Sequence, residues 1–278
     1  MKTIGFIDYF LDNWHANQYP KMIKAYNEEH GTDYVVKYAW AEKDGEKVTT
    51  DEWCANYEVE RCASIKEVCE KADFIMILAP SSPETHLGYA EEAFKYGKVT
   101  YVDKTFAPDL ATAQKIFDLA KENNVKFFSS SALRFAQELV PYADAKQDVM
   151  TIIGAGIFDE YVIHCIEMAV KFMGIGATKV RYEKFKDQEW GEIQYADGRF
   201  VRILMSLWMP YGIVLQDKDG VSKFESIDYS FFKYLLEDIM RFFETGKPSF
   251  DVNETLEVIK VREKLISAKE CEGQWINL

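Results

Sequence analysis

The stretch from Ala72 to Phe106, ADFIMILAPSSPETHLGYAEEAFKYGKVTYVDKTF, decides the fold of this chain. Within it, Phe74–Leu78 is an uninterrupted apolar run of strand length, which is typical of a parallel strand buried on both faces. A loop rich in proline and serine ends that strand. Thr85–Tyr96 then has apolar residues at helical spacing, with Gly97 as its C-cap, and a second strand is predicted at Val99–Val102.

This order of strand, helix and strand predicts one right-handed βαβ unit. Two loops, Ala79–Ser82 and Asp103–Phe106, then follow the carboxyl ends of neighbouring parallel strands. Doubly wound sheets bind their ligands at that edge. The two loops are therefore the first place to look for a binding site.

The same stretch resembles the N-terminal domain of the Gfo/Idh/MocA family, the glucose–fructose oxidoreductase and inositol dehydrogenase type. That family has the motifs T-P-x-x-x-H, A-L-x-x-G-K-H-V and E-K-P in this region. The resemblance continues through the helix expected at 107–124 and into Arg134-Phe135. Asp103 and Thr105 depart from the motifs. The residues that fit them are Pro80, His86, Gly97, Lys98, Val99 and Lys104.

The pattern of elements predicts two domains. Residues 1–130 are expected to form an α/β, doubly wound, Rossmann-type parallel sheet. Residues 131–278 are expected to form an α+β domain with a mainly antiparallel sheet, because turn sequences at Asp197-Gly198 and Asp217–Gly220 separate apolar strands. Arg134–Asp148 is interpreted as a helix and a connection. The second domain is short for the family that the chain resembles.

The first loop departs from a dinucleotide-binding loop. Asp8, Phe10 and Asn13 stand where the glycines of G-x-G-x-x-G belong. Glycine lets the backbone approach a pyrophosphate, and the helix N-terminus then stabilises its charge. Phe10 is expected to occupy that space, and Asp8 and Asp12 are expected to repel phosphates. The compatible alternative is that Asp12 or Asn13 caps the following helix.

The resemblance nevertheless implies that the loops at this edge of the sheet hold NAD or NADP. The cofactor-binding residues that it implies are Asp8, Phe10, Leu11, Ala79, Pro80, Ser81, His86 and Asp103.

A second informative stretch is Gly154–Gly174, GAGIFDEYVIHCIEMAVKFMG. Glu160, His164, Glu167 and Lys171 are its polar exceptions, and their spacing places them on one helical stripe. Periodicity alone favours the solvent face of an otherwise buried helix. The family, however, has D-x-G-x-H-x-x-D at this spacing. The resemblance therefore implies that His164 is the catalytic histidine. Glu160 then takes the position of the aspartate that precedes this histidine in the family.

These residue types suit the oxidation of a secondary alcohol. The reaction needs a base for the hydroxyl proton and a cation near the developing alkoxide. His164 is expected to accept the proton, because histidine titrates near neutrality. Glu160 is expected to orient the ring, and Lys104, which matches the lysine of E-K-P, is expected to bind the hydroxyl from the other domain. The hydride goes to a nicotinamide.

Composition narrows the class of protein. With 278 residues, 48% of them apolar, the chain can form a sizeable core, and no run reaches the roughly 18 apolar residues of a membrane span. A strand is predicted directly at the start, with no leader, so a cytoplasmic protein without a membrane partner is expected. A net charge of −13 argues against nucleic acid. The five cysteines contain no C-x-x-C pair, so no metal site is expected.

Three functions remain open from the sequence. The first is an NAD(P)-dependent oxidoreductase that acts on a small molecule, namely a sugar, a polyol or a related hydroxy compound. The second is a relative that has lost redox chemistry and binds a ligand or a protein. The third is a lyase or isomerase that uses Lys104 and His164 as an acid–base pair. In each case we expect a homo-oligomer that associates through the sheet at Lys179–Phe224, as is frequent in this family.

Overall fold

A computed structural model describes residues 1–278 of the chain. The residues form two compact units. The first unit contains Met1–Ser130 and Leu236–Phe250, and the second contains Ser131–Leu235 and Asp251–Leu278. The first unit therefore includes a late segment of the chain that the sequence interpretation leaves in the second half.

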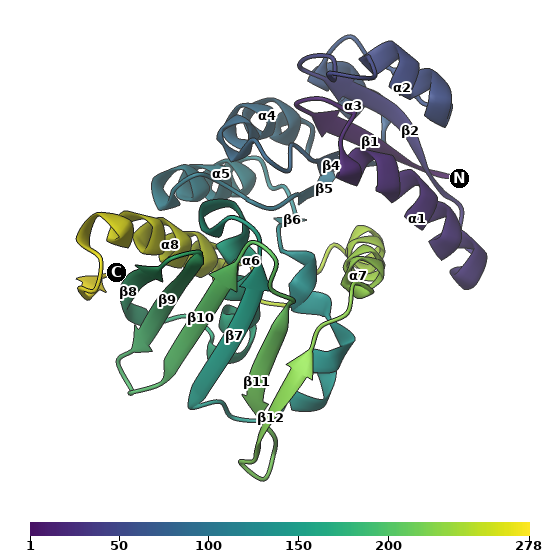
Figure 1. The fold of residues 1–278 in the computed structure, drawn as a ribbon. Coiled ribbons are helices and arrows are strands. Elements are labelled where there is room, and N and C mark those ends of the chain that lie inside the picture. The colour runs from purple at the N-terminus through teal and green to yellow at the C-terminus, as the bar shows by residue number, and fades with distance from the viewer. The chain divides into compact units, whose positions relative to one another are not determined.

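The first unit is built on a six-stranded, fully parallel sheet (Figure 1). The strand order is β3-β2-β1-β4-β5-β6, so the order reverses between β1 and β4. This confirms the predicted Rossmann-type fold. The strands are β1 (Lys2–Asp8), β2 (Tyr34–Ala41), β3 (Glu60–Arg61), β4 (Phe74–Ile77), β5 (Val99–Val102) and β6 (Phe127–Phe128).

The helices between these strands are α1 (Trp14–His30), α2 (Thr50–Tyr57), α3 (Ile65–Lys71), α4 (His86–Ala93) and α5 (Leu110–Glu122). Asn13 caps α1, because its Oδ1 accepts the N–H of Ala16 at 3.0 Å, which confirms one of the two expected capping residues. The apolar run in β4 is buried, with Ile75 and Met76 fully inaccessible, as a strand covered on both faces requires.

Helix α7 (Phe231–Thr245) brings the chain back to the first unit from Leu236 onward. Phe243 stacks on Phe74 with the ring centres 4.7 Å apart, and Phe242 packs edge-on against Phe128 at 5.0 Å. Aromatic pairs at these separations add to the free energy gained from burial. The segment is thus part of the core of the first unit.

The second unit is built on a seven-stranded sheet with the order β12-β11-β7-β10-β9-β8-β13. Only β7 and β10 pair in parallel, so the sheet is mainly antiparallel, as predicted. The strands are β7 (Val149–Ala155), β8 (Ala177–Phe185), β9 (Gln188–Tyr195), β10 (Phe200–Ser206), β11 (Gly212–Gln216), β12 (Ser222–Ser226) and β13 (Ile276–Asn277).

Helices α6 (Phe158–Met173) and α8 (Asn253–Ser267) pack on this sheet. Glycines in the strands allow the close approach. A Cβ at Gly154 would lie 2.4 Å from Sγ of Cys165 on α6, and one at Gly191 would lie 2.9 Å from a methyl carbon of Leu265 on α8. Both contacts lie on the same side of the sheet, because Gly191 pairs with Ile203 and Gly154 with Met205, two residues apart on β10.

One expected element is wrong. The region interpreted as a helix and connection, Arg134–Asp148, contains two short 3₁₀ helices, η3 (Ala132–Phe135) and η4 (Gln137–Tyr142). Pro141 lies inside η4 and has no N–H to donate, which disfavours a longer α-helix. Strand β7 follows directly and was not predicted, although its β-branched residues and alternating burial suit a strand.

None of the helices combines the length and the hydropathy that a membrane span needs.

Candidate functional site

In the first unit, Lys104 lies directly after β5 in the loop that the sequence analysis selected. Its Nζ donates to the carbonyl oxygen of Pro80 at 3.3 Å, and its backbone N–H donates to the carboxylate of Asp103 at 2.9 Å. The peptide bond between Lys104 and Thr105, where the family motif has proline, is cis. The loops after β4 and β5 are thus joined through the lysine side chain.

His86 joins the same two loops from inside. Its side chain is fully buried, with Nδ1 3.0 Å from the carbonyl oxygen of Phe106 and Nε2 2.9 Å from that of Leu78. Burial lowers the pKa of His86, while the two carbonyl groups act in the opposite direction. This geometry gives the histidine a positioning role between the loops. The cofactor contact expected for it stays a prediction.

Asp8 ends β1 and is fully buried. One carboxylate oxygen accepts the backbone N–H of Tyr9 at 2.7 Å and that of Ala79 at 3.0 Å. The other oxygen accepts the side-chain amide of Asn13 at 2.8 Å. Burial raises the pKa of the Asp8 carboxyl to about 7, against the effect of these hydrogen bonds. The carboxylate therefore bridges β1 and the loop after β4.

Asp103 is also buried, at the end of β5. Nδ1 of His15, on α1, lies 2.5 Å from one carboxylate oxygen, and the hydroxyl of Tyr101 donates to the other at 3.0 Å. Burial raises the pKa of Asp103, but His15 and the backbone of Lys104 outweigh it and hold the pKa below its ordinary value. Asp103 is thus a charged anchor beneath the loop that carries Lys104.

The other residues expected to bind a cofactor lie in three environments. Leu11 and Ala79 are buried, Phe10 and Pro80 are partly buried, and Ser81 is exposed. Ala79 has a positive φ of 42°, and its carbonyl accepts the N–H of Ser82 at 3.0 Å. Phe10 lies beside a cavity at the ends of β1 and β2. Contact between these residues and a cofactor stays a prediction.

That cavity has a volume of about 420 Å³, within the range of small-molecule sites. One of its lining residues is Lys43, whose Nζ lies 4.2 Å from the centre of the Tyr9 ring. The lining mixes an aromatic ring, two amines and three carboxylates. The residues that line it are Phe10, Asp12, Lys43, Asp44, Gly45, Glu46 and Lys47.

In the second unit, His164 is buried in the middle of α6. Oγ of Ser131 lies 2.6 Å from its Nδ1, and the ring of Tyr211 approaches edge-on, with the ring centres 6.1 Å apart. The solvent-face interpretation of the helical stripe is therefore wrong for this residue. Ser131 holds the imidazole in one orientation.

Glu167, one turn further along α6, is buried as well. It accepts a hydrogen bond from Nε of Arg134 at 2.8 Å and one from the backbone N–H of Ser131 at 3.3 Å. Arg134 also donates to Glu254 on α8 at 2.6 Å. Although burial lowers the pKa of Arg134, the two carboxylates raise it above its ordinary value. The Arg134–Glu167 pair is thus a structural support for Ser131.

Lys171 completes the stripe and is partly buried, with Nζ donating to the carbonyl oxygen of Arg134 at 2.6 Å. Burial, and then the charge of Arg134, lower the pKa of Lys171 to about 8. Glu160 is different, since it is exposed at the start of the helix. The ring-orienting role expected for Glu160 stays a prediction, while the partner seen at Nδ1 of His164 is Ser131.

Sequence reasoning did not select Ser131 or Arg134 as site residues. Ser131 and Arg134 lie 33 positions before their partners on α6, and Arg134 lies 120 positions before Glu254. The only local signal was the continuation of the family resemblance into Arg134-Phe135.

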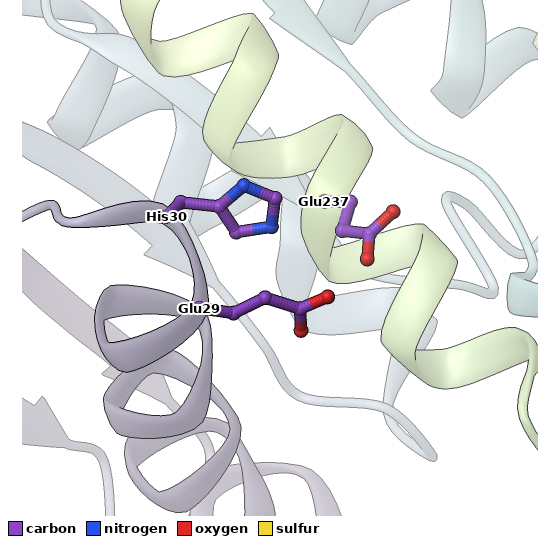
Figure 2. Close-up of side chains that lie close together, drawn as sticks. All are labelled: Glu29, His30 and Glu237. Atoms are coloured by element: carbon purple, nitrogen blue, oxygen red, sulfur yellow. The ribbon is translucent and has the colours of Figure 1, made fainter.

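One group of possible metal ligands lies elsewhere in the first unit (Figure 2). Glu29 and His30 at the end of α1 and Glu237 on α7 have ligand atoms within 4.8 Å of one another. Glu29 and His30 are exposed. The ring of Tyr26 packs against that of His30, with the ring centres 4.3 Å apart. Exposed acidic groups of this kind are common without a metal, so the group remains a structural observation.

The family resemblance implies a nicotinamide dinucleotide. The cavity beside β2 is large enough for a nucleoside, but its two lysines, Lys43 and Lys47, are outnumbered by three carboxylates. At the carboxyl end of β1, the backbone N–H groups of Tyr9 and Ala79 already bind Asp8, so a pyrophosphate does not find them free.

Comparison with known proteins agrees with this architecture. Residues 17–131 match the family described as "Oxidoreductase family, NAD-binding Rossmann fold". No curated protein sequence matches the chain.

Among solved structures, a myo-inositol 2-dehydrogenase from Lactobacillus plantarum is similar over 100% of both chains, with 15% identity and a TM-score of 0.78. A putative myo-inositol dehydrogenase from Sinorhizobium meliloti 1021 covers 100% of this chain and 99% of its own, with 14% identity and a TM-score of 0.77. A probable dehydrogenase from Thermotoga maritima covers 99% and 98%, with 15% identity and a TM-score of 0.77. At these identities, the structural likeness establishes the fold alone. Within the first unit, residues 17–131 are thus similar to the Gfo/Idh/MocA oxidoreductase family.

Proposed function

We propose that this protein is an NAD(P)-dependent oxidoreductase that oxidises or forms a secondary alcohol on a sugar, a polyol or a related hydroxy compound. The match of residues 17–131 to an NAD-binding oxidoreductase family supports the reaction class. Inositol dehydrogenases among the structures of the same fold support the substrate class. The observation that carries the proposal is a buried imidazole, His164, held at hydrogen-bond distance by Ser131.

His164 is the base in this proposal. When the alcohol is oxidised, its hydroxyl proton passes to the imidazole and the carbon loses a hydride. A fixed ring lowers the entropic cost of reaching the reactive geometry. Ser131 fixes the ring, and the Arg134–Glu167 pair fixes Ser131 through its backbone N–H. Ser131, Arg134 and Glu167 are thus positioning residues.

Lys104 is the cation. An ammonium group near the hydroxyl oxygen stabilises the negative charge that develops as the proton leaves. Its place after β5 is the edge at which doubly wound sheets bind ligands. A bound nicotinamide supplies the hydride acceptor, and Phe10, Lys43 and Lys47 would hold its adenosine end.

Two single substitutions test the assignment. The wild type, His164→Ala and Lys104→Ala are assayed with myo-inositol and a panel of sugars and polyols, with NAD and with NADP, by absorbance of the reduced nicotinamide. Loss of a general base reduces kcat by about 10² to 10⁴, and loss of one group that stabilises the developing charge reduces it by about 10² to 10³. Both variants are therefore expected to lose at least about 10² in kcat while remaining folded. Ser131→Ala is expected to lose less, because it only frees the ring.

The matched control is His30→Ala, which removes an exposed histidine at the end of α1 and is expected to leave kcat unchanged. Activity of His164→Ala equal to that of the wild type on a substrate that the wild type oxidises would refute the role of the imidazole. No turnover of any compound in the panel by the wild type would refute the substrate class.

A further inference from the structure

Asp8 lies at the point where the strand order of the first sheet reverses. β1 and β4 are neighbours there, and their outer partners β2 and β5 diverge to either side. Ligands of doubly wound sheets bind in the crevice at this reversal. The hydrogen bond from the N–H of Ala79 to Asp8, 3.0 Å long, crosses from the loop after β4 to the end of β1. At this reversal, a carboxylate of the chain itself therefore links the end of β1 to the loop after β4.

We propose that the Asp8 carboxylate is an internal anion at the phosphate position of the nucleotide site, and that it weakens the binding of a pyrophosphate, including that of NAD(P), relative to a glycine at this position. This inference rests on the proposed function, since it concerns the nucleotide site of that oxidoreductase. Asp8 is then a residue that sets cofactor affinity, and it needs no contact with the reacting atoms.

The contacts of Asp8 are those that a bound phosphate makes in such a loop. A phosphate accepts backbone N–H groups and lies at a helix N-terminus. Asp8 accepts the N–H groups of Tyr9 and Ala79, and it binds the side chain of Asn13, which caps α1. The cap also takes the N–H of Ala16 at 3.0 Å. Donors that would bind an incoming anion are thus already used.

The Asp8 carboxylate is both buried and fixed in position by hydrogen bonds. Asp8 has no exposed surface, and Asn13 donates both to Asp8 at 2.8 Å and to the carbonyl oxygen of Phe10 at 2.7 Å. These bonds close the segment from Asp8 to Asn13 into one turn. A pyrophosphate must therefore break hydrogen bonds and approach a buried negative charge, and both effects weaken its binding.

The proposal predicts a dependence on pH, because a protonated Asp8 repels phosphate less. The charged and titratable groups around it are Asp103 with its partner His15, and Tyr89 on α4 with its partner Glu42 after β2. Burial brings the pKa of Asp8 to about 7. Affinity for a pyrophosphate ligand is expected to rise as the pH falls from about 8 to about 6.

The test measures binding of ADP-ribose, which has the adenosine and pyrophosphate of a dinucleotide and no nicotinamide. Isothermal titration calorimetry is carried out at pH 8 on the wild type, Asp8→Gly and Asp8→Asn. Asp8→Gly removes the charge and restores the usual glycine, and Asp8→Asn removes the charge at nearly constant shape. We expect Kd to fall by about tenfold in Asp8→Gly, the effect of about one charged contact, and by less in Asp8→Asn.

Two controls isolate the pyrophosphate. Adenosine, which has no phosphate, is expected to bind all three proteins equally. Asp118→Asn removes the same charge from the exposed surface of α5 and is expected to bind ADP-ribose as the wild type does. The rise in affinity between pH 8 and pH 6 is expected in the wild type and absent in Asp8→Gly.

The proposal is overturned if Asp8→Gly and Asp8→Asn, both folded by circular dichroism, bind ADP-ribose no more tightly than the wild type. It is also overturned if adenosine gains as much affinity as ADP-ribose. Because no turnover is measured, these outcomes are separate from those for His164. A protein without dehydrogenase activity can still gain affinity for ADP-ribose on loss of Asp8, and an active one can fail to gain it.

Discussion

At the scale of single residues, buried polar side chains determine where the loops of both units lie. His86 ties the loops after β4 and β5 through Leu78 and Phe106. In the second unit, Ser131 ties the start of η3 to His164 on α6. Each contact satisfies a buried polar group, and its loss leaves that group without a hydrogen bond in a region from which water is excluded.

His86→Ala tests the first of these contacts. The substitution removes the imidazole N–H from between two buried carbonyl oxygens and opens a cavity, so the free energy of unfolding is expected to fall by about 3 kcal/mol. Chemical denaturation with urea measures it. His30→Ala, at an exposed histidine, is expected to change stability by less than about 0.5 kcal/mol. Equal effects of the two substitutions would show that the contacts of His86 contribute nothing to stability.

Lys171 makes stability depend on pH. Its pKa falls from 10.5 to about 8 on folding, so the unfolded chain binds the proton more tightly. Burying the charged ammonium lowers the free energy of unfolding at neutral pH. This loss disappears as the pH rises from about 8 to 10.5, because the lysine is then neutral in both states. The recovery amounts to roughly 2 to 3 kcal/mol.

The measurement compares urea denaturation of the wild type and Lys171→Met at pH 7, 8, 9 and 10. As the pH rises, the wild type is expected to gain stability relative to Lys171→Met. A difference that stays constant from pH 7 to pH 10 would contradict a lowered pKa at this lysine.

At the scale of elements, turn chemistry explains why some connections are tight and others are strained. The turn between β9 and β10 has Gly198 with a φ of 91°, a conformation that glycine adopts without cost. The turn between β8 and β9 has only two residues between the paired Phe185 and Gln188, and its first residue, Lys186, has a φ of 58°. Such hairpin turns favour glycine at that position.

Lys186→Gly is therefore expected to stabilise the protein by about 0.5 to 1 kcal/mol, because the lysine is exposed and its contact with the exposed ring of Phe185 adds little. Thermal unfolding followed by circular dichroism measures the change. The matched control is Lys218→Gly, an exposed lysine in the turn between β11 and β12 without a positive φ, which is expected to be neutral or destabilising. Equal shifts in Tm for both would rule out backbone strain as the cause.

At the scale of the whole molecule, the sheet of the second unit has one face under α6 and α8 and another that carries a charge cluster. Glu192 accepts from Nε of Arg181 at 2.7 Å and from Nε of Arg202 at 2.9 Å, and it is only 1% exposed. Leu204 lies on this face of β10, two residues after Arg202. We propose that this face forms the contact between copies of the chain.

Light scattering tests the association. The wild type is expected to have at least twice the 32.2 kDa mass of one chain. Leu204→Glu adds a charge to the proposed interface and is expected to shift the protein toward the monomer. Ala111→Glu adds the same charge to the exposed surface of α5. This variant is expected to have the same molecular mass in solution as the wild type. A wild type with the mass of one chain at micromolar concentration would end this proposal.

The sequence alone determined the elements whose signals are local. The apolar run of β4, the helical spacing of Thr85–Tyr96 and Gly97 after it predict structure within a few residues, because hydrophobic periodicity and capping depend on near neighbours. The family motifs extended that interpretation to the parallel sheet and to the mainly antiparallel one. The replacement of the glycines after β1 by Asp8, Phe10 and Asn13 was also visible, but the hydrogen bonds that these residues make were not.

Only the tertiary structure decided which polar groups meet. Asp8 binds a backbone N–H 71 positions away, and Arg134 binds a carboxylate 120 positions away. No local spacing encodes such pairs, since they form only when strands and helices from distant parts of the chain pack and exclude water. Burial then requires every polar group to find a partner, and the fold as a whole, more than any short motif, sets which partner is within reach.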